Sequence, residues 1–195
     1  EPETMADQPT LATEHLLLRP FQLTDAPRVR ELAGNPNVAL MTSNIPHPYA
    51  EGEAQNWISS HASDWQRGTA AIFAVCLRSN AALIGAVGLM NVYQGDTELG
   101  YWAELGYWAE LGYWIGEPYW GQGFASEAVD AVIGFGITSL ELQRIHAHHL
   151  SCTPASGKVL RNAGLSRVKK GTVSARDGVT QEPAEFYELV LIEGG

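Results

Sequence analysis

The stretch YWGQGFASEAV places Gly121 and Gly123 between a predicted strand and a predicted helix. Glycine has no Cβ, so two glycines here let backbone N–H groups approach a ligand closely. The first turn of the following helix adds N–H groups without intrahelical partners and the positive end of the helix dipole. Together these features favour an anion such as a pyrophosphate. A tight turn without a ligand has the same spacing, and the residues that would complete a P-loop or a dinucleotide fingerprint are missing.

A second group that could do chemistry is the histidine run HAHH, with His146, His148 and His149. On a strand, His146 and His148 share a face, which is compatible with a metal ion. No carboxylate or cysteine completes an obvious ligand set. We therefore expect ordinary strand residues and no metal.

The elements that must position these residues alternate between strands and helices. Strands are expected at 14–21, 70–78, 82–93, 142–150, 166–174 and 184–192, with another inside 98–115. Helices are expected at 23–34, 50–68, 125–140 and 153–164, and residues 35–49 read as a loop. This order predicts an α/β mixture with a largely antiparallel sheet and one β-α-β crossover. We expect a single domain over 1–195, with residues 1–9 as a flexible tail or a cloning remnant.

Composition narrows the class of protein further. The chain has 195 residues, 45% of them hydrophobic, and a net charge of −10, which argues against nucleic acid as a partner. No apolar run approaches the roughly 20 residues of a membrane span, so no membrane partner is expected. Cys76 and Cys152 fit neither a disulfide framework nor a zinc site, and reduced thiols favour a cytoplasmic location.

The chain resembles the GNAT superfamily of N-acetyltransferases, and within it the RimJ/RimL-like branch of ribosomal-protein-alanine N-acetyltransferases. The segments that carry the resemblance are LATEHLLLRPFQLTDAPRV, LIGAVGL, ELGYWIGEPYWGQGFASEA and TPASGKVLRNAGL. It implies a mixed, mostly antiparallel central sheet of about seven strands flanked by about four helices. It also implies a splayed cofactor cleft between the fourth and fifth strands.

The cofactor implied by the resemblance is acetyl-CoA, as a co-substrate. Backbone N–H groups from Gln122, Gly123, Phe124, Ala125 and Ser126 would hold its pyrophosphate. The strand Tyr113, Trp114 and Ile115 would pair with the pantetheine arm. At the late helix the branch has Asn-x-x-Ser, and here Thr153 replaces the asparagine while Ser156 matches.

Acetyl transfer to an amine needs a base, near-attack geometry, oxyanion donors and a proton for the leaving thiolate. Glu117 is the first candidate for the base, because it lies between the strand and the glycine loop. Glu110 on the strand is the second. Ser156 is the candidate donor to the leaving group, and the N–H of Trp114 or Ile115 is the candidate oxyanion donor. His47 and Tyr49 lie where the branch builds its acceptor wall.

Three consecutive copies of ELGYW plus one small or apolar residue occupy 98–115, where the resemblance predicts one copy. The six-residue unit is even, so a slip by one copy keeps each side chain on its face. We expect the last copy, 110–115, to form the strand because it joins the cofactor loop. Residues 94–109 are expected to be an inserted or duplicated segment. They would bulge out as a loop or small hairpin, or pair with another subunit in a homodimer.

The predicted function is acetyl-CoA-dependent N-acetylation of a primary amine, with the N-terminal α-amine of a protein or peptide as the leading acceptor. A small amine, such as an amino acid, polyamine or aminoglycoside, is the second reading. The third is a non-catalytic acyl-CoA-binding domain. The sequence leaves the identity of the acceptor open.

Overall fold

The computed structural model describes residues 6–93 and 107–191, and their strands form one eight-stranded sheet with the order β1-β2-β3-β4-β5-β6-β8-β7. The strands are β1 (Leu11–Ala12), β2 (Leu16–Pro20), β3 (Ala71–Leu77), β4 (Leu83–Tyr93), β5 (Trp108–Ile115), β6 (Arg144–Leu150), β7 (Ser166–Ser174) and β8 (Gln181–Val190). The additional strand over the seven expected is β1, which pairs with β2 through Leu11 and Leu18.

All neighbouring strands are antiparallel except β5 and β6. The connection between these two strands runs through helix α5 (Phe124–Ser139), as a parallel pair requires. This arrangement confirms the predicted mixed sheet with one β-α-β crossover.

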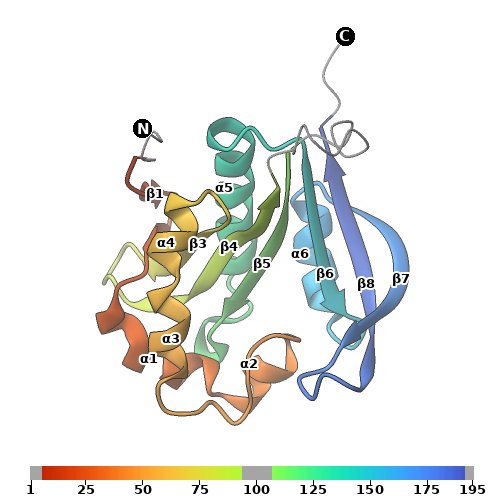
Figure 1. The fold of residues 1–195 in the computed structure, drawn as a ribbon, viewed down its shortest axis with the longest axis horizontal. Helices are drawn as coiled ribbons and strands as arrows, with labels where there is room; N and C mark the ends of the chain where they lie inside the picture. The colour runs from red at the N-terminus through yellow and green to blue at the C-terminus, as the bar shows by residue number, and fades with distance from the viewer. Residues whose placement is uncertain (1–5, 94–106, 192–195) are drawn as a thin grey trace.

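The helices cover both faces of the sheet (Figure 1). The other α-helices are α1 (Ala26–Ala33), α2 (Pro36–Leu40), α3 (Glu53–Ser59), α4 (His61–Gln66) and α6 (Pro154–Asn162), with short 3-10 turns η1 (Leu23–Asp25) and η3 (Glu117–Tyr119). Helices α1, α2 and α3 pack on one face, and α5 and α6 pack on the other.

Two local features differ from the predicted helices. Helix α2 lies inside the segment expected to be a loop; the Asn35 side chain accepts a hydrogen bond from Asn37 N at 2.8 Å, and Pro36 occupies the first helical position. The helix expected over 50–68 is divided into α3 and α4 at Ser60. There the hydroxyl of Ser59 donates to Asn56 O and that of Ser60 to Trp57 O, contacts that bend helices.

Each face of the sheet has its own hydrophobic core, because successive strand residues point to opposite faces. On the α5 side, Leu89, Leu111 and Val129 belong to one buried cluster. On the α1 side, Val29, Ile72 and Ala86 belong to the other. Strands β4 and β5 contribute to both clusters, which fixes the face of every side chain on these two strands.

Residues 6–9, which fall within the tail expected over 1–9, lie against the domain. Ala6 O accepts a hydrogen bond from Trp65 Nε1 at 2.7 Å, and Gln8 Nε2 donates to Ile72 O at 2.8 Å. Of the segment 94–109, Trp108 and Ala109 belong to β5, and residues 94–106 lie outside the described part of the chain. Among the described residues, no helix has the length and apolar character that crossing a membrane demands.

Candidate acyl-transfer site

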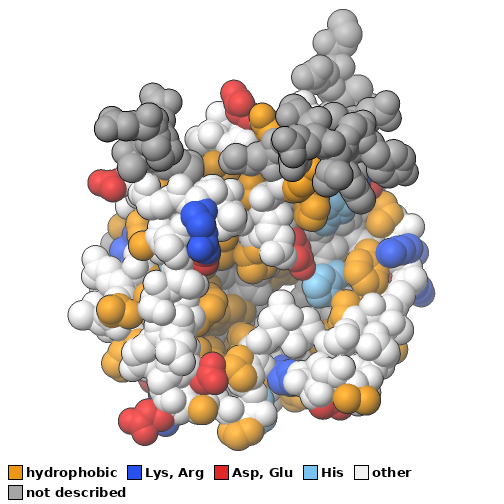
Figure 2. Space-filling model, viewed as in Figure 1, with side chains coloured by type: hydrophobic (Ala, Val, Ile, Leu, Met, Phe, Trp, Pro, Cys, Tyr) orange, Lys and Arg blue, Asp and Glu red, His pale blue; other side chains and the backbone are white. Residues whose placement is uncertain are grey.

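A cavity of about 1340 Å³ opens where β5 and β6 separate. The two strands pair only at Trp108↔Arg144, Ala109↔Ile145 and Glu110↔His146. Beyond Glu110 they diverge, and the cavity is lined by the remainder of β5, the end of β6 and the first turns of α5 and α6. Figure 2 shows this hollow, with hydrophobic, acidic and histidine side chains around it. The splayed pair is the cleft that the sequence predicted.

The glycine loop forms one end of the cavity. Gly121 and Gly123 have φ of 73° and 81°, the left-handed region that favours glycine, and a Cβ at either would meet no atom within 4 Å. Gly123 is the N-cap of α5, and as a glycine it has no side chain with which to cap the helix. Phe124, Ala125 and Ser126 line the cavity, so the uncapped N–H groups of this turn are available to an anion there. Gln122 is exposed and does not line it.

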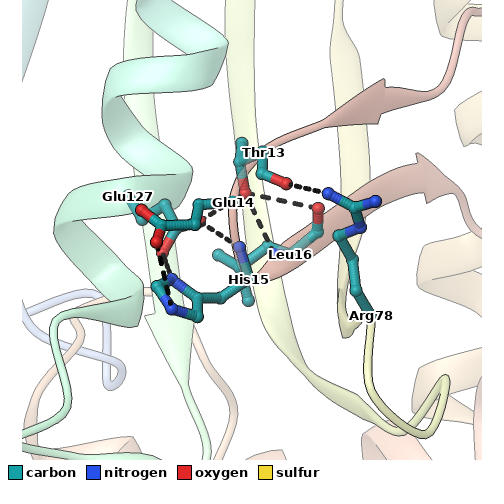
Figure 3. Close-up of polar contacts among 6 residues, drawn as sticks. All are labelled: Thr13, Glu14, His15, Leu16, Arg78 and Glu127. Carbon is teal, nitrogen blue, oxygen red and sulfur yellow. Dashed lines mark hydrogen bonds and ion pairs between the residues drawn. The ribbon is translucent and has the colours of Figure 1, made fainter.

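Glu127 is the one acidic residue in the first turn of α5, and its carboxylate is held outside the cavity. Figure 3 shows it bound to the segment before β2: Thr13 Oγ1 donates to Oε1 at 2.6 Å, and His15 N donates to Oε1 at 2.7 Å. Burial raises the pKa of Glu127, but these hydrogen bonds and His15 outweigh burial and lower the pKa overall. Thr13 and His15 therefore hold the Glu127 carboxylate away from the cavity. The N–H groups at the start of α5 that face the cavity are left without this carboxylate as a partner.

The open edge of β5 presents unpaired backbone donors. Gly116 N donates to Ile84 O at 2.7 Å, so Gly116 faces β4. Backbone groups of successive strand residues alternate in direction. The N–H of Trp114 therefore also faces β4, and those of Tyr113 and Ile115 face the cleft. Of the two oxyanion donors that the sequence left open, only Ile115 presents its N–H to this edge.

Ser156 and Tyr113 meet at the α6 side of the cavity, and both line it. The Tyr113 hydroxyl donates to Ser156 O at 3.4 Å. Burial raises the pKa of Tyr113 to about 12, so the phenol keeps its proton at neutral pH. Thr153 is 3% exposed, does not line the cavity, and donates its hydroxyl to Leu150 O at 2.8 Å. Its hydroxyl is therefore committed to the β6–α6 junction.

Glu110 lies at the last position where β5 pairs with β6, and the residue lines the cavity. Asn91 Nδ2 donates to Glu110 Oε2 at 3.0 Å, and His148 Nδ1 lies 3.6 Å from Glu110 Oε1. Asn91 has φ of 50° and lies where the β4–β5 register shifts between Met90 and Tyr93. This irregularity directs the amide toward the carboxylate, as bulges near functional sites often do.

Glu117, the first candidate for the base, does not line this cavity. Its Oε2 accepts a hydrogen bond from Asn35 Nδ2 at 2.6 Å, and its Oε1 accepts one from Asn37 Nδ2 at 2.9 Å. The carboxylate thus joins the η3 turn to the start of α2. The structure brings Glu110, Ser156 and Tyr113 into one cavity and leaves Glu117 beside it.

The third wall of the cavity comes from the segment after α2. His47 and Tyr49 both line the cavity, together with Trp57 of α3. Burial raises the pKa of Tyr49, and the charge of Glu53 adds to that effect. Arg176, in the β7–β8 turn, donates to Ile45 O and, at 2.8 Å, to Thr42 O. The guanidinium therefore ties the turn to this wall.

The sequence did not predict Asn91, Trp57 and Arg176 as site residues, and it offered His148 only as a possible metal ligand. His148 lies two residues after His146 on β6, so the two side chains share a face of the sheet. In the structure His146 pairs directly with Glu110, which brings His148 close to the same carboxylate. The other three come from a bulge, a helix and a turn, and their positions depend on the tertiary fold. Among the described residues, no group of three or more His, Cys, Asp or Glu side chains is arranged to hold a metal ion.

Comparisons with known proteins agree with this geometry. The family profile described as "Acetyltransferase (GNAT) domain" matches residues 15–166. The curated "uncharacterized N-acetyltransferase p20" of Bacillus licheniformis is 34% identical over 186 residues, which cover 94% of this chain and 96% of that protein.

Solved structures share the fold at low sequence identity. RimL, a ribosomal L7/L12 α-N-protein acetyltransferase in complex with coenzyme A, superposes with a TM-score of 0.76 at 15% identity, over 94% of this chain and 98% of that one. The ribosomal-protein-S5-alanine acetyltransferase of Vibrio fischeri gives 0.76 at 17% identity, over 93% and 96%. These neighbours carry names from the branch that the sequence motifs resemble.

Proposed function

Because the chain belongs to the GNAT family of acetyltransferases, we propose that it transfers the acetyl group of acetyl-CoA to the N-terminal α-amine of a protein or peptide. The observation that carries the proposal is the single cavity between β5 and β6. It joins an uncapped helix N-terminus, an open strand edge, a carboxylate and two hydroxyl groups.

The residues of one end of the cavity fit acetyl-CoA. The N–H groups from Gly123 to Ser126 would hold its pyrophosphate, at the positive end of the α5 dipole. The N–H of Ile115, which faces the cleft, would bind the pantetheine arm, and the N–H of Tyr113 would remain for the thioester. Bound there, acetyl-CoA supplies an activated acyl group as a thioester.

Glu110 is the residue that we propose as the base. An attacking amine must lose a proton, and a carboxylate within reach of it can accept that proton directly or through one water molecule. Glu110 lines the cavity, and Asn91 fixes one of its oxygens. The second oxygen faces His148, which can receive the proton next. Glu117 has both oxygens engaged by amides, which favours a structural role.

The remaining roles fall to groups on the other side of the cleft. The N–H of Tyr113 would stabilise the oxyanion that develops when the amine nitrogen attacks the thioester carbonyl, because Ile115 lies about 16 Å along β5 from Glu110, too far to share one reaction centre with the base. Ser156 would donate a hydrogen bond to the leaving thiolate, and the Tyr113 hydroxyl, which stays protonated, lies next to it. We also place the protein in the cytoplasm, the location that its two unpaired cysteines favour.

A peptide or protein N-terminus is the preferred acceptor because the cavity is large, at about 1340 Å³, and residues 42–49, which form its third wall, lie outside helices and strands. The names of RimL and of the S5-alanine enzyme also refer to protein acceptors. These relatives lend support to the acceptor class only, since their identity to this chain is low.

The test is a CoA-release assay with purified protein, acetyl-CoA and two acceptor sets: short peptides with free N-termini, and small amines including amino acids, polyamines and aminoglycosides. Mass spectrometry locates the acetyl group on the product. We expect acetylation of the peptide α-amine, and none of the same peptides when the N-terminus is blocked. If the protein acetylates small amines but no peptide, the acceptor is a small amine and not a protein N-terminus. If it binds acetyl-CoA but acetylates neither set, it is a non-catalytic acyl-CoA-binding domain.

A further inference from the structure

Two glycines face each other across the strands that form the floor of the cavity. In the β4–β5 ladder, Gly88 lies opposite Gly112, with the pair Ala86↔Trp114 on one side and the pair Met90↔Glu110 on the other. Directly opposed residues of an antiparallel pair share a face. Glu110, the proposed base, therefore shares its face with the glycine pair.

The side-chain tips of Met90 and Ile72 cover the glycine pair on this face of the sheet, and a Cβ at Gly88 would also lie 3.1 Å from Ala71 O. A Cβ at Gly112 would lie 2.6 Å from Met90 Cε, and a Cβ at Gly88 would lie 2.5 Å from Ile72 Cδ1. Methionine is unbranched and adapts its shape easily. A ligand group can therefore displace the Met90 tip and reach the backbone of Gly112, which any other residue at 112 would obstruct.

The walls around the glycine pair are apolar and aromatic. Trp57, Tyr49, Ile45, Ile72, Met90 and Trp114 all line the cavity and belong to, or pack against, the core cluster on the α1 side. Among the described residues, the cavity lining includes one lysine and one arginine, and neither is among the residues of these walls. Lys158 is on α6, and Arg176 is bound to backbone carbonyls.

Burial of an apolar group against such walls is favourable, whereas burial of an unpaired charge is not. Successive same-face positions on a strand are about 7 Å apart. An amine held at Glu110 would therefore carry its first side chain over Gly112 and Gly88.

From this arrangement, and resting on the proposed function, we infer that the acceptor is an α-amine whose own carbon bears a large apolar or aromatic side chain. The floor of the subsite that holds this side chain is the Gly88–Gly112 pair, and its adjustable wall is Met90. The sequence alone leaves the acceptor open because this pocket forms only when two glycines from separate strands lie opposite each other.

The experiment measures kcat/KM for peptides that are identical except for the first residue: phenylalanine, leucine, alanine, lysine or glutamate. We expect phenylalanine and leucine to exceed alanine by about tenfold or more, since each added methylene in an apolar pocket contributes strongly. Gly112→Val should remove this advantage, so that the ratio of kcat/KM for the phenylalanine peptide to that for the alanine peptide falls toward one.

Two further variants make the test independent of one substitution. Met90→Ala should enlarge the pocket and raise the rate for a tryptophan peptide relative to alanine, even if Gly112→Val folds poorly. Gly134→Ala is the control, because a Cβ at this exposed position of α5 meets no atom within 4 Å. It should leave the ratio of phenylalanine to alanine unchanged.

Equal rates for all first residues, or a preference for lysine through Glu53, would overturn this inference while the proposed function stands. Unchanged preference in both Gly112→Val and Met90→Ala would overturn it as well. Absence of acetylation for every peptide, with acetyl-CoA bound, would instead remove the proposed function and this inference with it.

Discussion

Glu110 and His148 lie on neighbouring parallel strands, with Oε1 and Nδ1 3.6 Å apart, at the point where the strands cease to pair. Ser43 Oγ lies 3.5 Å from the other ring nitrogen, Nε2. This arrangement places a carboxylate and an imidazole in series at the wall of the cavity. A proton taken up by Glu110 can pass on to the imidazole of His148 beside it, whereas a carboxylate without such a neighbour would have to release the proton to water.

The role of Glu110 as the base can be tested by comparing substitutions of Glu110 and of Glu117, the other candidate. Glu110→Gln keeps the shape and the contact with Asn91 but removes the base, so kcat/KM should fall by about 10²- to 10⁴-fold. Affinity for acetyl-CoA should remain, which calorimetry checks.

Glu117→Gln is the matched control for that substitution. It disturbs only the hydrogen bonds from Asn35 and Asn37, so it should lower the free energy of unfolding by about 1 kcal/mol and leave kcat/KM within about tenfold. If Glu117→Gln abolishes turnover while Glu110→Gln does not, the two roles are reversed.

Ser156 and Tyr113 are expected to share the donation to the leaving thiolate. Ser156→Ala and Tyr113→Phe should each reduce kcat, and the double variant should lose less than the product of the two single losses, because both hydroxyl groups serve one sulfur atom. Steady-state kinetics of the four proteins measures this coupling. Strictly independent losses, or no loss in either variant, would exclude the shared role.

The glycine loop is expected to matter for acetyl-CoA beyond its effect on stability. Gly123→Ala forces a side chain into φ of 81°, at a cost of about 1–2 kcal/mol in unfolding free energy, and should weaken acetyl-CoA binding at least about tenfold. Gly178→Ala is matched, with φ of 71° in the β7–β8 turn and no cavity contact. It should lose similar stability and keep its affinity; equal affinities in the two variants would argue against an anion site at α5.

Acid stability should depend on His61. The ring is 7% exposed, stands against Phe21 and Trp57, and has no hydrogen bond from a described residue to either nitrogen. Burial lowers the pKa of His61 to about 4, and the charge of Asp64 only partly offsets this effect. The folded-state pKa lies below the unfolded value of about 6.5. The stabilising contribution is therefore complete above pH 6.5 and is lost as the pH falls toward 4.

Urea unfolding at pH 7 and pH 4.5 measures that contribution. The unmodified protein should lose on the order of 2 kcal/mol through this group between pH 7 and pH 4.5, and His61→Leu should lose correspondingly less across the same interval. Parallel pH profiles of the two proteins would show that His61 is not the sensitive group.

Much of the fold was predictable because it depends on local patterns. The strand-rich segments before residue 94, the Ser126-containing helix and the Pro154 helix start each have signals within a few residues. The third ELGYW copy lies in β5, and its face assignment follows from strand parity alone. Helix α2 was missed because Asn35 and Pro36 can begin either a loop or a helix, and packing of Val38 and Ala39 in the core decides between them.

The site was less predictable because its contacts join distant parts of the chain. Glu117 was preferred as the base for its closeness in sequence to the cofactor loop, yet Asn35 and Asn37 bind its carboxylate from the α2 start. Asn91 reaches Glu110 only through an irregularity in β4, and Arg176 reaches the acceptor wall from the last hairpin. None of these pairings has a local sequence signal.

Calorimetric titration with acetyl-CoA, on the full chain and on a chain lacking residues 98–106, tests the central claim most directly. The shortened chain keeps Trp108 to Ile115 of β5 and the glycine loop intact. We predict one binding site per chain in both proteins, with similar affinity, since the cavity is lined by the third copy of the repeat. No binding by either protein would contradict the assignment of this cavity to acetyl-CoA, and with it the acetyltransferase mechanism built upon it.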